Sequence, residues 1–190
     1  MENINHIIKG CIHKEPKYQR LLYDRYRGFA CKVVFRYIYR YEKAIDVVTD
    51  GFVKAFNHFD NFKLREEEDA EKLLMGWLKR IMINCAIDEL RHSNMLAEIG
   101  GIPEDVWEIT DKNDDADQLI LYKDLISLVK ELPPNYHVVF NLYVLDGYSH
   151  SQIAEVMNIS ISTSRSSLSR AKALLQNLIK NMEEGKLCRI

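Results

Sequence analysis

Apolar residues in the first half of the chain recur every three to four positions, which is the period of an α-helix. The pattern predicts three helices, over residues 18–39, about 44–56 and about 71–91. The segment 61–70, NFKLREEEDA, separates the last two and is polar enough for an exposed loop. In the third helix, Trp77 lies within the apolar series, so we expect it to contribute to a core.

Helical spacing returns in the second half of the chain, over residues 119–132. Pro133 and Pro134 end this helix and begin the next, because proline is tolerated in the first turn of a helix. That second helix runs to Gly147. The whole chain of 190 residues holds only eight glycines and four prolines, which favours a mostly helical fold.

The net charge of −2 averages over blocks of opposite sign. Residues 17–40 carry seven basic side chains against one acid, and residues 156–182 carry four basic side chains and no acid. Between them, residues 98–117 carry eight acids against one lysine. Such asymmetry indicates a polyanionic partner for both ends and a middle that avoids it. We therefore predict an all-α fold of two small helical domains, residues 1–94 and 119–190, joined by an acidic flexible linker over residues 95–118.

The segment from Gly147 to Lys172, GYSHSQIAEVMNISISTSRSSLSRAK, predicts a short apolar helix, a turn and a longer serine-rich helix. Ser149 followed by Gln152 is the signature of a capping box at the start of the short helix. The longer helix is expected to pack through apolar positions three and four apart, namely Leu168, Ala171, Leu175 and Leu178. This is helix-turn-helix geometry, whose second helix enters the major groove of DNA. A helical hairpin with a solvated serine-rich face is the alternative.

These motifs carry a resemblance to a known family. Residues 132–176, LPPNYHVVFNLYVLDGYSHSQIAEVMNISISTSRSSLSRAKALLQ, resemble the fourth conserved region of bacterial RNA polymerase sigma factors of the extracytoplasmic-function (ECF) group, in forms closest to those of Bacteroidota. Residues 44–56, AIDVVTDGFVKAF, resemble the helix of the second region. Residues 76–92, GWLKRIMINCAIDELRH, resemble the helix after the promoter-melting loop. The resemblance spans nearly the whole chain apart from about fifteen N-terminal residues and the linker, and it implies a factor that directs promoter-specific transcription initiation.

The resemblance also implies which residues contact each partner. The clamp helices of the RNA polymerase core would dock on Asp46, Asp50, Phe52 and Lys54. The minus-ten promoter element, as single-stranded DNA, would contact Lys63, Lys79, Arg80, Asn84 and Arg91. The minus-thirty-five element, as duplex, would contact Thr163, Ser164, Arg165, Ser166, Ser169, Arg170 and Lys172. The chain departs from the common pattern at Ile45 and Thr49, where many members carry an acid and a glutamine.

The sequence also bears on alternative functions and on a further partner. A stand-alone helix-turn-helix regulator would account for the C-terminal motif but not for the N-terminal resemblance. We expect no enzyme and no cofactor, because the chain has no glycine-rich phosphate loop, nucleophile elbow or HExxH pair. His150 is expected near the cap of the short helix. The family makes an anti-sigma protein a further expected partner.

The cysteines and the hydropathy bear on metal binding and location. None of the four cysteines has CxxC spacing. We therefore expect buried, reduced thiols in a cytoplasmic protein. His6, Cys11 and His13 lack a fourth ligand, so we expect no metal site. No apolar run approaches the roughly 20 residues that span a bilayer, so we expect no membrane insertion.

Overall fold

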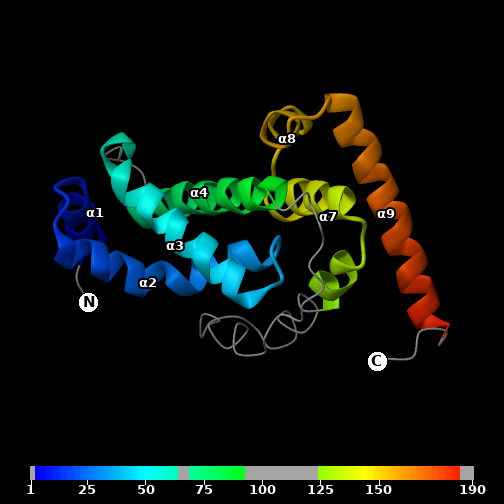
Figure 1. Cartoon of the computed structure of the whole chain (residues 1–190), viewed down its shortest axis with the longest axis horizontal. Helices are drawn as coiled ribbons and strands as arrows, with labels where there is room; N and C mark the ends of the chain where they lie inside the picture. The colour runs from blue at the N-terminus through cyan, green and yellow to red at the C-terminus, as the bar shows by residue number, and fades with distance from the viewer. Residues whose placement is uncertain (1–2, 64–68, 93–123, 185–190) are drawn as a thin grey trace. The chain divides into compact units, whose positions relative to one another are not determined.

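The computed structural model of the chain describes residues 3–63, 69–92 and 124–184, and every element in these ranges is a helix (Figure 1). The all-α prediction is therefore confirmed for the described residues. The chain divides into two compact units, one mainly of residues before 93 and the other mainly of residues after 110. The predicted linker, residues 95–118, lies outside the described residues, so its limits stay a prediction.

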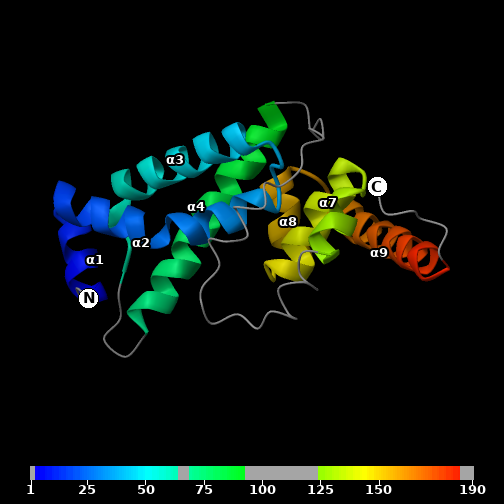
Figure 2. The same cartoon turned by 90° about the horizontal axis from the view of Figure 1, so that it is seen from below.

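The described residues of the N-terminal unit form four α-helices and one short 3-10 turn, and Figure 2 shows how α1 to α4 are arranged. They are α1 (Ile4–Ile12), α2 (Pro16–Phe35), α3 (Tyr41–Asn57), η1 (Phe59–Asn61) and α4 (Ala70–His92). Helices α2, α3 and α4 pack against one another. The largest fully buried side chains of this core are Ile8, Leu22, Tyr37, Phe52, Phe59, Leu74, Leu78, Met82, Ile83 and Ile87. The three predicted helices are thus confirmed, with boundaries that differ by a few residues.

Helix α1 is an element that the sequence pattern did not predict. Its Ile7, Ile8 and Cys11 are buried, and Asn3 caps its start by accepting a hydrogen bond from the backbone N–H of Asn5 at 3.0 Å. Gly10 lies so close to α2 that a Cβ there would overlap the ring of Tyr18. Helix α1 is therefore part of the core of this unit. Among the described residues, no group of three or more His, Cys, Asp or Glu side chains is placed to hold a metal ion.

The C-terminal unit contains a helical segment over 124–130, followed by α7 (Pro134–Phe140), η2 (Asn141–Leu145), α8 (His150–Met157) and α9 (Ile161–Glu183). Pro133 and Pro134 separate the first two helices as predicted. The helix begun at Pro134 ends in a π-helical turn, in which the N–H of Asp146 donates to the carbonyl of Asn141 at 3.0 Å. The core of this unit includes Ile126, Val129, Val138, Val139, Leu142, Ile153, Leu168 and Ala171. Within the described ranges, none of the helices has the length and hydropathy to cross a membrane.

Candidate nucleic-acid interface

Helices α8 and α9 are joined by a three-residue turn whose geometry is fixed by local capping. The predicted capping box starts α8: the hydroxyl of Ser149 accepts from the N–H of Gln152 at 3.3 Å, and the amide oxygen of Gln152 accepts from the N–H of Ser149 at 2.9 Å. Asn158 ends α8 in the left-handed conformation, with φ 53° and ψ 48°. Two residues later, Ser160 caps α9 by accepting from the N–H of Thr163 at 3.0 Å. The result is the predicted helix-turn-helix.

Helix α9 presents a buried stripe and an exposed face. The stripe consists of Ser164, Ser167, Leu168, Ala171 and Leu175, while Leu178 is half-buried. The predicted packing positions are therefore confirmed. The exposed face carries Thr163, Arg165, Ser166, Ser169, Arg170 and Lys172. The first two turns combine hydroxyls with arginine and have no acidic side chain. Such a face suits the phosphates and base edges of a major groove.

Ser164 differs from its predicted role as a DNA contact. Its side chain is completely buried, and its hydroxyl lies 2.9 Å from Nδ1 of His150. Position 164 precedes Leu168 by four residues and Ala171 by seven, which places it on the packed side of α9. Ser164 therefore joins α9 to α8 and does not face solvent. His150 is the first residue of α8, as expected from the motif.

Two basic side chains of α9 contact tyrosines of the preceding helices. The guanidinium of Arg170 donates to the hydroxyl of Tyr136 at 3.2 Å. The ammonium of Lys172 lies 6.0 Å from the ring centroid of Tyr143, which in turn stacks on His150 at 4.6 Å. These contacts restrict the positions of both charges and leave them exposed on the same helix as Arg165.

Helix α3 exposes part of the predicted polymerase-docking set. Asp46 and Asp50 lie one helical turn apart on its exposed face, beside Val53, which is 52% exposed. Lys54 is also exposed, with its ammonium 3.8 Å from a carboxylate oxygen of Asp88 on α4. Phe52 is only 2% exposed, so it differs from the prediction of a direct contact and belongs to the core.

The reason for the burial of Phe52 is its position among the helices. Its ring packs edge-on against Tyr23 of α2, with centroids 4.8 Å apart, and also meets Phe56 at 6.0 Å.

At Thr49, where the family commonly has glutamine, the hydroxyl donates to the carbonyl of Ile45 at 2.9 Å. That side chain is engaged with its own helix.

Most of the predicted single-strand contacts lie along α4. Arg80 and Asn84 are exposed one helical turn apart, and Lys79 beside them is half-buried. The exposure of Asn84 argues against a purely structural hydrogen-bonding role inside the helix packing. Arg91 is exposed near the end of α4, 3.5 Å from Asp88. Lys63 is exposed beyond η1, and the residues after it, 64–68, lie outside the described residues.

The polar segment 61–70 leaves the core through a cluster of three aromatic rings. Phe59 and Phe62 are buried, and both pack against Trp77 of α4, with ring centroids 5.1 Å and 5.3 Å apart. Trp77 is half-buried and contributes to the core as predicted. This cluster ties the start of the segment to the helix that carries Arg80 and Asn84.

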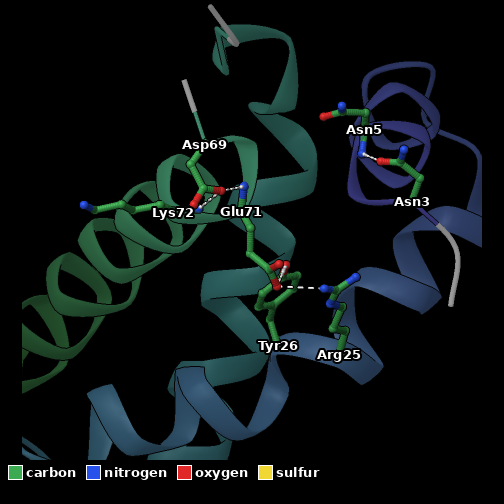
Figure 3. Close-up of polar contacts among 7 residues, drawn as sticks. All are labelled: Asn3, Asn5, Arg25, Tyr26, Asp69, Glu71 and Lys72. Carbon is green, nitrogen blue, oxygen red and sulfur yellow. Dashed lines mark hydrogen bonds and ion pairs between the residues drawn. The ribbon is translucent and has the colours of Figure 1, made fainter. Parts of the chain in front are cut away.

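The same segment rejoins the core through a polar network that the sequence did not reveal (Figure 3). Asp69 caps α4 by accepting from the N–H groups of Glu71 at 3.0 Å and Lys72 at 3.3 Å. One oxygen of Glu71 accepts from the guanidinium of Arg25 at 2.8 Å and from the hydroxyl of Tyr26 at 2.9 Å. Burial, and then the hydrogen bond to Glu71, hold the pKa of Tyr26 well above its ordinary value. The hydroxyl therefore stays protonated and fixes α4 to α2.

Two family models match the chain, one mainly in the N-terminal unit and the other in the C-terminal unit. Residues 22–94 match "Sigma-70 region 2", and residues 122–175 match "Sigma-70, region 4". Region 2 thus covers α3 and α4, and region 4 covers the helix-turn-helix.

Similar proteins agree with these matches over most of the chain. The ECF RNA polymerase sigma-E factor of Haemophilus influenzae is 26% identical over 175 residues, covering 87% of this chain and 89% of that protein. The factor of the same name from Escherichia coli K12 is 28% identical over 181 residues, covering 87% and 88%. The sigma factor RpoE of Bartonella quintana, solved in complex with the anti-sigma factor NepR, shares the fold with a TM-score of 0.51 at 20% identity, covering 85% of this chain and 96% of that one.

Proposed function

Because the chain belongs to the sigma-70 family and is a sigma factor of the ECF type, we propose that it binds RNA polymerase core and directs it to a particular set of promoters. The observation that carries this proposal is the presence of both family regions, each on its own helical unit. A stand-alone regulator needs the helix-turn-helix alone and gives no role to α3 and α4.

In the proposed complex, the N-terminal unit docks on the clamp helices of the core through the exposed face of α3. Asp46 and Asp50 are suited to basic partners, and Val53 adds an apolar group between the polar ones. Lys54 lies at the edge of this face, paired with Asp88. Phe52 acts indirectly, because its buried ring sets the position of α3 against α2.

The same unit captures the minus-ten element as a single strand on α4. Arg80 and Asn84 face outward and can meet phosphates and an unstacked base. Lys63, Lys79 and Arg91 supply further positive charge, which attracts the phosphate backbone. The aromatic cluster and the Glu71 network hold both ends of the segment 61–70 beside this helix.

The C-terminal unit reads the minus-thirty-five element as duplex through the exposed face of α9. Arg165 is suited to a guanine edge, and the hydroxyls of Thr163, Ser166 and Ser169 to phosphates. Arg170 and Lys172 extend the positive charge along the helix. Ser164 does not touch DNA in this proposal, because it is buried.

The proposal places the protein in the cytoplasm, with the polymerase. The chain itself then needs no catalytic centre, cofactor or metal, since nucleotide addition is the work of the core enzyme. An anti-sigma protein is a further proposed partner, supported by the Bartonella quintana factor solved with one. The particular resemblance to sigma factors of Bacteroidota stays a prediction.

The decisive experiment is in vitro transcription from genomic fragments, using matched core polymerase with and without the purified protein. We expect new start sites that share two spaced upstream elements. The substitutions Asp46→Lys and Asp50→Lys together should abolish these starts by weakening core binding. Absence of new starts, combined with tight operator binding by the protein alone, would contradict the proposal and support a stand-alone regulator.

A further inference from the structure

Helix α4 carries a line of four exposed residues spaced about one turn apart: Lys72, Gly76, Arg80 and Asn84. Residues four apart on a helix are surface neighbours, so these positions form one continuous stripe. Lys72 and Arg80 are cationic and Asn84 carries an amide, whereas Gly76 has no side chain. No carboxylate among the described residues forms an ion pair with Lys72 or Arg80.

The packing of the protein does not require a glycine at position 76. A Cβ built on Gly76 would have no atom of the described residues within 4 Å, whereas one on Gly51 would collide with the side chain of Met82, and one on Gly10 with Tyr18. The last two glycines permit close helix packing. Gly76 instead lies inside a long helix, where glycine is less favourable than alanine by about 1 kcal/mol. Glycine at this position therefore destabilises the helix without any gain in packing.

The missing side chain lowers the surface of α4 between two positive charges. The Cα atoms of a helix lie on a cylinder of about 2.3 Å radius, whereas the side chains extend to about 5–6 Å from the axis. At a rise of 1.5 Å per residue, Lys72 and Arg80 are separated by about 12 Å along the axis, with Gly76 midway. The stripe is thus a shallow saddle that is flanked by cations and followed by Asn84. Its shape and charge suit the close approach of a sugar-phosphate backbone.

We propose that Gly76 is a positioning residue for the unwound minus-ten strand, whose sugar-phosphate backbone crosses α4 at this glycine between Lys72 and Arg80. An approach to this depth brings the next base toward Asn84. The inference rests on the proposed function, since it deepens the role of α4 in strand capture. It adds Gly76 and Lys72 to the residues that the sequence suggests for this role.

The proposal predicts that a side chain at position 76 raises the stability of the protein but weakens its binding to DNA. The substitution Gly76→Ala should raise the melting temperature, because alanine favours the helix and meets no neighbour. The same change should weaken binding of the holoenzyme to a fork-junction DNA whose minus-ten element is single-stranded on the non-template strand. Gly76→Leu should weaken it further, by tenfold or more. If the larger side chain lifts the strand off one cation, the salt dependence of binding should become shallower by about 0.7 for each phosphate that is no longer neutralised.

Core affinity, fork binding and initiation together distinguish the possible outcomes. Core affinity should be the same for wild type and Gly76→Leu; a lower core affinity would show that the saddle faces the polymerase and would overturn the proposal. Asn181→Leu, which adds the same side chain to an exposed position late in α9, should leave fork binding unchanged. Equal fork binding by wild type and Gly76→Leu would also overturn it. If the wild-type holoenzyme itself neither binds the fork nor initiates, the proposed function fails, and this result is distinct from a failure at Gly76.

Discussion

The buried pair of His150 and Ser164 leads to a prediction that separates folding from DNA reading. Ser164→Ala removes a hydroxyl that is completely buried and lies 2.9 Å from Nδ1 of His150. The imidazole then keeps a partly buried nitrogen without its partner, which costs about 1–3 kcal/mol. For a domain of 60–100 residues, each kcal/mol lowers the melting temperature by about 4–8 °C. The sequence preference at the minus-thirty-five element should not change, because Ser164 does not face the groove.

Thermal unfolding followed by circular dichroism measures the first effect, and holoenzyme binding to a panel of minus-thirty-five variants measures the second. Ser166→Ala is the matched control, since Ser166 is exposed two residues away and should change stability by less than about 0.5 kcal/mol. A double-mutant cycle with His150→Ala should show that the two destabilisations are not additive. An unchanged melting temperature together with altered promoter preference would refute the reasoning, because it would make Ser164 a DNA contact.

Three further predictions concern other parts of the molecule. Arg165→Ala should weaken holoenzyme binding to the preferred minus-thirty-five sequence by about 1–3 kcal/mol and reduce discrimination between sequences; equal weakening on every sequence would instead indicate a phosphate contact. Gly10→Ala should destabilise the protein by about 1–3 kcal/mol in urea unfolding, because the new methyl overlaps Tyr18; unchanged stability would contradict the docking of α1. Burial raises the pKa of Cys11 from 9.0 to about 12, so the unfolded chain releases this proton first and stability should fall between these pH values. The decline is at most about 1.4 kcal/mol per pH unit for this thiol, and Cys11→Ala should make it shallower.

Periodicity and capping signals predicted most of the helices and the helix-turn-helix. They succeeded where a helix was long and one-sided, as in α9 with Leu168, Ala171 and Leu175. They missed α1, which lacks a capping box like the one that marked the eight-residue α8. Its available signals were the cap at Asn3 and the apolar positions 7, 8 and 11, which become meaningful only once α2 covers them.

The candidate site was predictable only in part, because burial depends on neighbours that the sequence does not place. Ser164 was assigned to DNA by its polar side chain, although its spacing from Leu168 and Ala171 already placed it on the packed side. The network of Glu71 with Arg25 and Tyr26 joins residues more than forty positions apart, so no local pattern could reveal it. Hydrophobic spacing identifies such helices, whereas polar partners across helices require the folded structure.

The division of α9 into a buried stripe and an exposed face has a consequence for how promoter preference can change. Every residue proposed to touch duplex DNA in the first turns, from Thr163 to Ser169, projects away from the positions that hold α9 on α7 and α8. Substitutions on the outer face therefore leave intact the packing volume and the hydrogen bond from the backbone N–H of Thr163 to the hydroxyl of Ser160. A duplicated copy of the gene could drift to a new set of promoters while each intermediate still folds and still engages the same polymerase.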